Sequence, residues 1–538
     1  MKRSILLLWS LMLFFTTTAQ VTVEQWNRYE FASKVQVKGN PFDLSFSATF
    51  THADTTMTVS GFYAGNDTFK VRFMPMKTGE WTFVTHSSVG KLDGLRGRFE
   101  CIEASDCNHG PVQVADKVHF KYADGTRYYP IGTTSYDWAH IEGDNPEQTI
   151  RSLQESGFNK MRMLLLVQNF DKNYPEPLYF PFEIKKLTTD ENGKKVYEWD
   201  YTRFNPAFFD LVEKRIDALM GIGVEADLIL FHPYDEDRWG FDRMPLEVCL
   251  RYLEYVTARL SSFQNVWWSL ANEFNFLKEH PLAHWEAFTQ KVVETDPYRH
   301  LCSIHGGTAT YYDYWKPEFT HCSIQDQAPV EDHGRAGTVR NIYQKPVVFD
   351  EVCYEGNMGS RWGNLSGEEM LYRMWQGLIA GTYVSHSECF MDAPNDFTHN
   401  FLARGGKFQG ESWKRIRFMR DILEAMPNPL QLSDSSWDPY VSIAGENYLM
   451  IYLGKKIQHE WVFDLPSRNH SYPRLKEGTR LKVEIIDTWN MTVTEYPVVF
   501  ELAAPGRYRV CDKENRSVIL PEKPYLLLRI TESDKSSW

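Results

Sequence analysis

The stretch WWSLANEFNF, Trp267 to Phe276, begins like a buried strand and turns abruptly polar at Asn272 and Glu273. Two indoles and an apolar run suit a protein core, whereas an amide and a carboxylate are costly there without partners. Such a change within one strand is typical of a strand whose tip leaves the core at a binding or catalytic site. The segments on either side indicate which fold provides such a tip.

Eight short apolar runs, of which this stretch provides one, lie between about Val112 and Pro427. Amphipathic segments separate the runs, and one of these segments opens with Asn205 and Pro206, a suitable helix N-terminus. Strand-then-helix units repeated over roughly 300 residues predict an α/β fold, the (β/α)8 TIM barrel. In that fold, the segment 168–203 is an enlarged loop on the active-site side. The eight runs are YYPIGTT, NKMRMLLL, VEADLILF, NVWWSLAN, HLCSIHG, THCSIQD, PVVFDEV and TYVSHSE.

The two ends of the chain show a different pattern. Apolar and polar residues alternate at about 21–108 and again at about 430–538, with turn residues between the runs. A period of two indicates half-buried antiparallel strands, so each end is predicted to form a β-sandwich. The predicted domains are an N-terminal sandwich at 21–110, a catalytic barrel at 111–428 and a C-terminal sandwich at 429–538.

The first 20 residues have the three parts of a secretory signal peptide. Lys2 and Arg3 precede an apolar run from Ile5 to Phe15, which the small polar segment TTTAQ follows. This run is shorter than the ~20 residues that span a bilayer. The sequence therefore predicts a soluble protein that is exported to the periplasm or secreted.

Composition narrows the classes of ligand. The 538 residues carry a formal charge of −13, which disfavours nucleic acid and anionic membranes as partners. Aromatic residues make up 15% of the chain, a content that suits ligands with apolar faces. The 8 cysteines are too few for a disulfide scaffold. Most of them resemble lone buried thiols, although Cys101 and Cys107 are close enough in sequence to pair.

A second acidic strand tip strengthens the case for chemistry. In the run KPVVFDEV, apolar residues are followed by Asp350 and Glu351, just as the apolar residues of the fourth predicted strand are followed by Glu273. Carboxylates on two non-adjacent barrel strands can face each other across the mouth. Cleavage of a glycosidic bond needs such a pair, one protonated to donate to the leaving oxygen and one ionised. Adjacent strand residues point to opposite faces, so only one of Asp350 and Glu351 is expected to enter the mouth.

These motifs resemble clan A of the retaining glycoside hydrolases. The strings ADLILFHPYD, VWWSLANE, KPVVFDE and YEGN, with the flanking alternating regions, are similar to a bacterial family whose barrel is apiosidase-like. The resemblance implies that Glu273 is the acid/base and Glu351 the nucleophile. It further implies that Asn272 binds the sugar 2-hydroxyl and that Arg162 holds Glu351 ionised. Many clan A enzymes have an aromatic platform after strand eight, where this chain has His386 and Glu388. These two are assigned to substrate binding. The alternatives for Glu388 are that it perturbs Glu273 or pairs with an Arg.

Further polar residues follow the predicted strands. The string FHPYDED, with His232, could suggest a metal site, but no zinc motif accompanies it, so substrate hydrogen bonding is favoured. His305 and Gln325 either touch substrate or bridge loops. Aromatic side chains at the strand tips are predicted to stack on sugar rings or line the substrate site. They are Trp138, Trp239, Trp362 and Tyr354.

The sequence therefore predicts an exported retaining glycoside hydrolase that acts on an oligo- or polysaccharide and needs neither metal nor cofactor. No GxSxG elbow, P-loop or GxGxxG motif points to other chemistry. Two alternatives stay open: a non-catalytic carbohydrate-binding protein on a barrel scaffold, and a polysaccharide lyase. The sugar, the linkage, endo or exo action and the oligomeric state are left undetermined.

Overall fold

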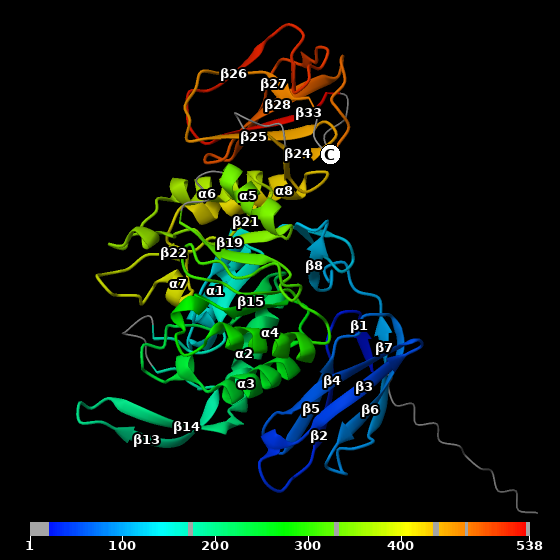
Figure 1. The fold of residues 1–538 in the computed structure, drawn as a ribbon, viewed down its shortest axis with the longest axis vertical. Coiled ribbons are helices and arrows are strands. Elements are labelled where there is room, and N and C mark those ends of the chain that lie inside the picture. Colours follow the sequence, from blue (N-terminus) through cyan, green and yellow to red (C-terminus); the bar gives the residue numbers. More distant parts are fainter. Residues whose placement is uncertain (1–20, 170–175, 328–332, 434–440, 468–471, 534–538) are drawn as a thin grey trace, which may run out of the picture.

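The computed structural model describes residues 21–169, 176–327, 333–433, 441–467 and 472–533. The predicted signal peptide at 1–20 lies outside these ranges. Three regions follow one another in the chain (Figure 1): an N-terminal β-sheet region, a central α/β body and a C-terminal β-region at the opposite end of the molecule. One hydrophobic core runs from Phe62 in the first region through the central body to Leu527 in the last.

The N-terminal region folds over on itself at strand β4. This strand pairs with β3 as far as Ser60 and with β5 from Gly61 onward, so it belongs to both halves of the sheet. A Cβ at Gly61 would lie 2.4 Å from the Phe46 ring, so the close packing at the switch requires glycine. Tyr29 stacks on Phe99 at 4.1 Å between the two halves. The strands, in the order β1-β7-β6-β3-β4-β5-β2, are β1 (Thr22–Glu24), β2 (Tyr29–Lys34), β3 (Phe46–His52), β4 (Thr55–Tyr63), β5 (Thr68–Phe73), β6 (Gly79–Ser87) and β7 (Arg96–Ile102).

A buried ion-pair network joins this region to the central body. Arg72 of β5 donates to Glu213 at 2.8 Å, and Arg259 donates to the same carboxylate at 2.6 Å. Burial alone would raise the pKa of Glu213, but the guanidinium groups of Arg259 and Arg72 outweigh it and hold the pKa at about 2. The carboxylate therefore stays ionised between two buried cations.

We expect Glu213→Gln to lower the free energy of unfolding at pH 7 by about 3–5 kcal/mol, because it leaves two buried guanidinium groups without their anion. In the wild type this contribution is present above pH 4.5 and is lost as the pH falls toward 2, since the folded pKa lies below the ordinary value of 4.5. Urea unfolding at several pH values measures both effects. Glu254→Gln, whose exposed carboxylate lies 3.8 Å from Lys291, is the control and should change little. Equal stability of Glu213→Gln and wild type would contradict the assignment.

Each of the eight apolar runs contains a parallel strand of the central body. They form a five-stranded sheet, β11-β12-β15-β16-β17, and a three-stranded sheet, β18-β19-β21. Isolated parallel bridges link the two sheets at both junctions, His305 to Ser323 and Thr133 to His386. The result is a barrel-like sheet. Its strands are β11 (Gly132–Thr134), β12 (Lys160–Leu164), β15 (Glu225–Phe231), β16 (Val266–Ala271), β17 (Cys302–Ser303), β18 (Cys322–Gln325), β19 (Val347–Glu351) and β21 (Tyr383–Val384).

Helices follow most of these strands and cover the sheet from outside (Figure 1). Asn205 caps α2 as predicted, since its side chain accepts from the Ala207 N–H. The helices are α1 (Asn145–Ser156), α2 (Pro206–Met220), α3 (Leu246–Leu260), α4 (Leu282–Thr295), α5 (His333–Tyr343), α6 (Gly367–Ile379), α7 (Phe401–Arg404) and α8 (Ile416–Glu424). None of the described helices is long and apolar enough to cross a bilayer.

The central body also contains smaller sheets, separate from the barrel-like sheet. The described part of the predicted loop 168–203 forms a hairpin that projects from the body in Figure 1. Two further strands, β20 and β22, pair in parallel beyond the tips of β19 and β21. These smaller elements are β8 (Val112–Ala115), β9 (His119–Tyr122), β10 (Arg127–Tyr128), β13 (Phe182–Thr189), β14 (Lys195–Phe204), β20 (Glu355–Gly356) and β22 (Glu388–Cys389).

The C-terminal region centres on a sheet that is buried on both faces. Along β25, Leu449 and Ile451 belong to the region's own core, whereas Met450 and Tyr452 join the core of the central body. Side chains that alternate between two cores fix this region against α6. Its strands are β23 (Gln431–Leu432), β24 (Ser442–Gly445), β25 (Tyr448–Gly454), β26 (Glu460–Val462), β27 (Asp464–Pro466), β28 (Arg480–Asp487), β29 (Thr492–Glu495), β30 (Phe500–Glu501), β31 (Arg509–Cys511), β32 (Ser517–Ile519) and β33 (Leu526–Glu532).

All eight cysteines are free thiols in this structure. Cys101 is buried in the N-terminal core and Cys107 is exposed, so the pairing left open by the sequence is not formed.

Candidate active site

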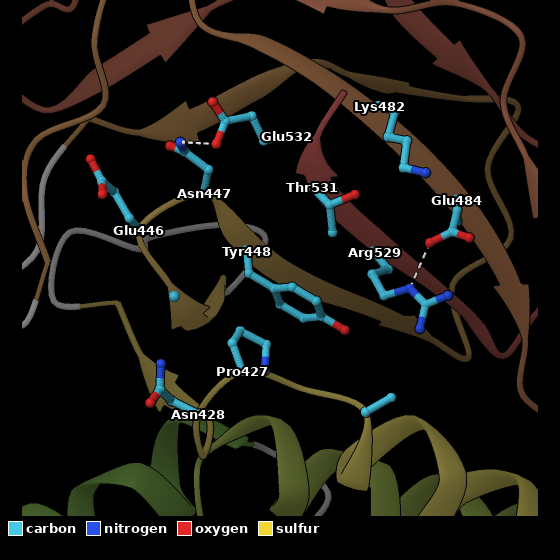
Figure 2. Close-up of a pocket in the computed structure, with 12 residues that line it drawn as sticks. Pro427, Asn428, Glu446, Asn447, Tyr448, Lys482, Glu484, Arg529, Thr531 and Glu532 are labelled. Atoms are coloured by element: carbon cyan, nitrogen blue, oxygen red, sulfur yellow. Dashed lines mark hydrogen bonds and ion pairs between the residues drawn. The ribbon is translucent and has the colours of Figure 1, made fainter. Parts of the chain in front are cut away.

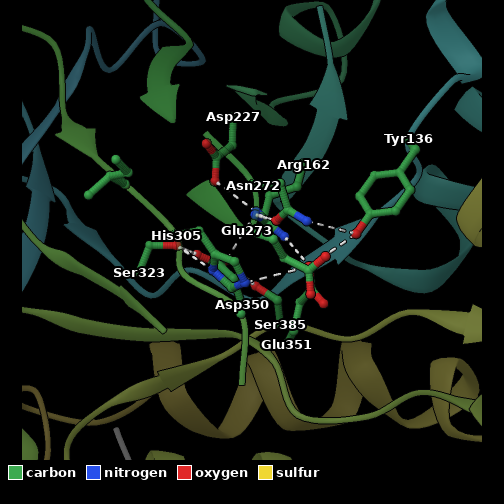
Figure 3. Close-up of polar contacts among 12 residues, drawn as sticks. Tyr136, Arg162, Asp227, Asn272, Glu273, His305, Ser323, Asp350, Glu351 and Ser385 are labelled. Atoms are coloured by element: carbon green, nitrogen blue, oxygen red, sulfur yellow. Dashed lines mark hydrogen bonds and ion pairs between the residues drawn. The ribbon is translucent and has the colours of Figure 1, made fainter. Parts of the chain in front are cut away.

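The tips of β16 and β19 place two carboxylates in one polar cluster (Figure 3). Glu273 is the second residue after the end of β16, and Glu351 is the last residue of β19. Glu273 has a backbone φ of +48°, a left-handed conformation that is uncommon for a residue with a side chain. Strain of this kind is typical of functional sites, because the surrounding structure must hold it in place.

Glu351 accepts hydrogen bonds from two residues that are distant from it in the sequence. Arg162 of β12 donates to Glu351 Oε1 at 3.2 Å, and the Tyr136 hydroxyl donates to the same oxygen at 3.0 Å. His305 Nε2 lies 3.6 Å from that oxygen, and burial lowers the pKa of His305 well below its usual value, with Arg162 adding to the effect. A neutral imidazole, a cation and a hydroxyl therefore surround the carboxylate, which is only 5% exposed.

A chain of side chains connects the two carboxylates. Tyr234 donates to Glu273 Oε2 at 2.8 Å, and Asn272 Nδ2 lies 2.5 Å from the Tyr234 hydroxyl. The same amide nitrogen lies 3.3 Å from the Tyr136 hydroxyl, which donates to Glu351. Arg162 in turn donates to Asn272 Oδ1 at 2.6 Å. The amide is thereby fixed between the acids.

Glu273 has a raised pKa. Its burial and the nearby charge of Glu351 raise the pKa of Glu273 to about 7, although Tyr234 and Gln325 oppose the rise. A carboxyl with this pKa holds its proton up to neutral pH and can act as a general acid. Two carboxyl groups with different environments are the arrangement that assigns one as acid and the other as base or nucleophile.

The premise that Asp350 and Glu351 point to opposite faces of the strand does not hold in the structure. The register between β18 and β19 shifts at this point, because Ile324 pairs with Phe349 while Gln325 pairs with Glu351. This irregularity interrupts the alternation of side chains, as a β-bulge does. Both acids therefore reach Arg162, at 3.9 Å for Asp350 and 3.2 Å for Glu351.

Asp350 lies deeper than Glu351 and has a supporting role. Lys160 lies 2.8 Å from Asp350 and 2.6 Å from Asp227, and Ser323 and Ser385 donate to Asp350. Burial alone would raise the pKa of Asp350, but Lys160 and then Arg162 hold it far below its usual range. The buried cations and anions beneath the site are thus paired, which fixes the Arg162 guanidinium under Glu351.

Other predicted residues support the site from nearby positions. His232 uses both ring nitrogens, since Nε2 lies 3.0 Å from Leu166 O and Nδ1 accepts from the Tyr234 N–H at 3.1 Å. It therefore positions Tyr234. Gln325 forms a hydrogen bond with Glu273 that lowers the pKa of Glu273. Tyr354 is buried, and its burial and the charge of Glu351 raise its pKa.

The three predicted tryptophan platforms lie in different environments. Trp138 is fully buried, with its indole nitrogen 3.2 Å from Met163 Sδ, so no face is open to a ligand. Trp239 is 4% exposed and lies against the Arg238 guanidinium. Trp362 is partly buried and packs edge-on against Tyr354 at 6.0 Å. Of the three, only Trp362 keeps an exposed surface beside a site residue.

His386 and Glu388 do not reach the carboxylate pair. Ser385 points inward to Asp350, so by alternation His386 and Glu388 point to the outer face of the strand. There the His386 ring stacks on Phe158 at 4.9 Å. Glu388 accepts from the Gly410 N–H at 2.9 Å, and burial raises its pKa to about 8. The assignment of these two residues to substrate binding is therefore corrected.

The sequence interpretation missed Tyr136, which contacts Glu351 directly. It follows the first strand in the string TTSYDW, and its place after a strand tip is the signal that could have found it. We expect Tyr136→Phe to lower kcat/KM about 10- to 100-fold, because it removes a hydrogen bond to an ionised group. Steady-state kinetics measure the loss. Tyr252→Phe, which removes a buried hydroxyl 3.3 Å from Leu230 O, is the control and should keep wild-type kinetics. Unchanged kinetics in Tyr136→Phe would contradict the contact.

A separate pocket lies between the end of α8 and the C-terminal sheet (Figure 2). It encloses about 250 Å³, and its walls include Tyr448 and the ion pair of Arg529 with Glu484 at 2.6 Å. Its two other acids, Glu446 and Glu532, lie on a different wall from Glu484 (Figure 2). The pocket has no arrangement comparable to Glu273 and Glu351, so the chemistry is assigned to the strand tips.

Comparisons with known proteins identify the family of the central body. Residues 115–387, about half of the chain, match the family model of apiosidase-like catalytic domains. The chain belongs to this family. Residues 22–88 and 437–531 of this apiosidase-like protein match two domain families of unknown function, DUF5060 and DUF5605. The curated proteins contain no match to it.

Solved structures support the same classification. The apiosidase-like protein is 52% identical to a protein of Bacteroides vulgatus ATCC 8482 described as a putative glycoside hydrolase. The match covers 95% of this chain and 100% of that chain, with a TM-score of 0.93. A family 5 glycoside hydrolase of the same organism is 12% identical, with 80% and 95% covered and a TM-score of 0.57, and so shows the fold alone. The protein is a glycoside hydrolase, and its substrate is a carbohydrate.

Proposed function

We propose that this glycoside hydrolase cleaves O-glycosidic bonds with retention of configuration, by double displacement, with Glu351 as nucleophile and Glu273 as acid/base. The observation that carries the proposal is the difference between the two carboxyl groups. Burial and the charge of Glu351 raise the pKa of Glu273 to about 7, while Arg162 and Tyr136 donate to Glu351. One acid thus keeps its proton in a large fraction of the molecules at neutral pH, and the other faces donors that stabilise negative charge.

In the first step, Glu351 Oε attacks the anomeric carbon and the bond to the leaving oxygen breaks. The Glu273 proton moves to that oxygen, so the leaving group departs as an alcohol. Asn272 lies between the two carboxylates and is placed to bind the sugar hydroxyl next to the anomeric carbon. Its Oδ1 is occupied by Arg162, so its Nδ2 faces the ligand and the two tyrosine hydroxyls.

In the second step, water hydrolyses the glycosyl ester on Glu351, and Glu273 takes the water proton. Formation of the ester removes the negative charge of Glu351, one of the two causes that raise the pKa of Glu273. The pKa of Glu273 therefore falls in the intermediate, and the same group becomes a base. The second proton transfer regenerates both groups.

The proposal extends to the whole chain. The barrel-like sheet serves as a (β/α)8 barrel, and the two flanking regions serve as sandwich domains that pack on it. Export rests on the signal-peptide pattern of residues 1–20 and is tested by N-terminal sequencing of protein from the periplasm or medium of an expressing bacterium. A mature chain that still begins at Met1 would contradict export.

Proton NMR of the first-formed product tests the mechanism. A panel of aryl glycosides and plant polysaccharides supplies the substrate, and the anomeric signal is followed before mutarotation. We expect the product to appear first with the configuration of the substrate. The opposite anomer would refute double displacement. Products that absorb in the ultraviolet as 4,5-unsaturated sugars would identify a lyase, and binding without any turnover across the panel would favour a binding protein.

A further inference from the structure

A second acidic cluster lies on the outer side of the strand tips, away from the carboxylate pair. Glu355 and Glu388 face each other across the paired strands β20 and β22. His386 precedes Glu388 by two residues and so lies on the same face. One potential ligand atom from each of the three residues lies within 4.8 Å of the others. The three side chains are 3%, 0% and 1% exposed for Glu355, His386 and Glu388.

His386 presents one nitrogen without a partner. Its Nδ1 lies 3.2 Å from Thr133 Oγ1, whereas its Nε2 is fully buried and has no hydrogen-bond partner among the described residues. Phe158 stacks on the ring at 4.9 Å, and Phe408 packs edge-on at 5.8 Å. The two phenyl rings hold the imidazole in place, and a buried nitrogen left bare in this way is costly. Nε2 is therefore the nitrogen that is free to bind a ligand beside the two acids.

The two carboxylates are oriented but not neutralised. Backbone N–H groups of the segment 409–412 donate to Glu388 and to Glu355, including those of residue 410 at 2.9 Å and residue 412 at 3.0 Å. No ion pair of the described residues includes either acid, and the nearby Lys414 is paired with Glu411 at 2.6 Å. Buried carboxylates without a cationic side chain need a proton or a metal ion. Their oxygens keep lone pairs for one, because each carboxylate offers about four acceptor sites.

We propose that Glu355, His386 and Glu388 bind one divalent transition-metal ion of the class that takes nitrogen and oxygen ligands, represented by Zn²⁺. An imidazole with two carboxylates is a ligand set that Zn²⁺ accepts, whereas Ca²⁺ prefers oxygen ligands alone. The backbone N–H groups of 409–412 form the outer shell that orients the carboxylates. The ion fastens this segment to the tips of the seventh and eighth strands.

The walls of the cluster favour a structural ion. A Cβ at Gly410 would lie 2.5 Å from Glu355 Cδ, and a Cβ at Gly367 would lie 2.9 Å from Glu355 Oε1. The backbone therefore closes on the carboxylate and leaves no room there for a sugar. The sequence predicts no metal site. Glu355 lies on β20 and Glu388 on β22, and the register of these two strands brings the two acids together.

Metal analysis of the full-length wild type is the first test. The protein is treated with EDTA, dialysed and titrated with ZnCl₂ by calorimetry, and its zinc content and Tm are measured before and after. We expect one Zn²⁺ per chain and a Tm that rises by roughly 3–8 °C at saturation. CaCl₂ should raise the Tm less. No zinc retained and no change in Tm would overturn the proposal and leave a protonated Glu388 as the way the acids are accommodated.

Variants locate the ion. Glu388→Gln keeps an oxygen for the 409–412 N–H groups but loses the charge, so we expect Zn²⁺ to bind at least about 10-fold more weakly. Glu411→Gln changes an adjacent acid whose side chain binds Lys414, and it should bind Zn²⁺ like the wild type. His284→Ala breaks a close pair of imidazoles by removing one of them; there His280, before α4, has its Nδ1 3.3 Å from Nδ1 of His284 on α4. Zinc binding that Glu388→Gln leaves unchanged, or that His284→Ala abolishes, would overturn the assignment. If Glu388→Gln does not fold, the Tm of His284→Ala is measured with and without Zn²⁺. A rise like that of the wild type excludes the imidazole pair as the zinc site, whereas the loss of the rise would overturn the assignment.

Discussion

Glu351→Ala should lose roughly 10⁴- to 10⁶-fold in kcat, the scale on which hydrolases lose activity when a catalytic nucleophile is removed. Arg162 and Tyr136 both donate to Glu351, and no other described carboxylate accepts both of these hydrogen bonds. No other described carboxylate is therefore held in position to attack in its place. Added azide should restore turnover of an activated aryl glycoside, since the small anion fills the space that the carboxylate leaves. The product should be a glycosyl azide of inverted configuration, identified by NMR.

Glu351→Gln provides the matched control. Its amide keeps the volume of the carboxylate, so it should be inactive and azide should not rescue it. Wild-type turnover of Glu351→Ala would remove Glu351 from the mechanism. If azide instead restores turnover of Glu351→Ala and the glycosyl azide has the configuration of the substrate, Glu351 has the acid/base role.

Glu273→Ala is expected to lower kcat/KM by about 10²- to 10⁴-fold on a substrate with a poor leaving group, the range of general acid catalysis. An aryl glycoside with a strongly acidic leaving group needs no proton in the first step, so that step should be almost unaffected. Azide should then give a glycosyl azide of retained configuration, because it replaces water in the attack on the intermediate on Glu351. An equal loss on both substrates would contradict the acid role.

The pH profile of the wild type tests the same group. Glu273 must be protonated to act as an acid, and its pKa is raised to about 7. The value of kcat/KM for a poor leaving group should therefore fall as the pH rises through 7, by about tenfold for each further unit. Glu273→Gln cannot ionise at this position, so its residual activity should lack this alkaline limb. An alkaline limb that persists in Glu273→Gln belongs to another group.

Much of the fold follows from local patterns. Each of the eight apolar runs became a parallel strand, and Asn205 became a helix cap, because strand runs, amphipathic periods and caps are properties of neighbouring residues. The acids at the ends of β16 and β19 were found for the same reason. The carboxyl ends of parallel strands meet at one edge, so residues at two such ends come together without any knowledge of loops.

The tertiary structure decided what depends on register and on contacts between distant segments. The shift between β18 and β19 turned both Asp350 and Glu351 inward, although a regular strand predicts that only one of them faces that way. Trp138 lies after a strand tip as a platform should, yet packing closes over it.

The sequence by itself determined the order of strands and helices and the two acidic tips, because local periodicity specifies which segments form strands. Only the tertiary structure decided how those acids differ. Burial, Tyr234 and the charge of Glu351 act on Glu273, while Arg162 and Tyr136 act on Glu351. These partners come from other strands, and a pKa depends on the charges and solvent around a group rather than on its neighbours in the chain.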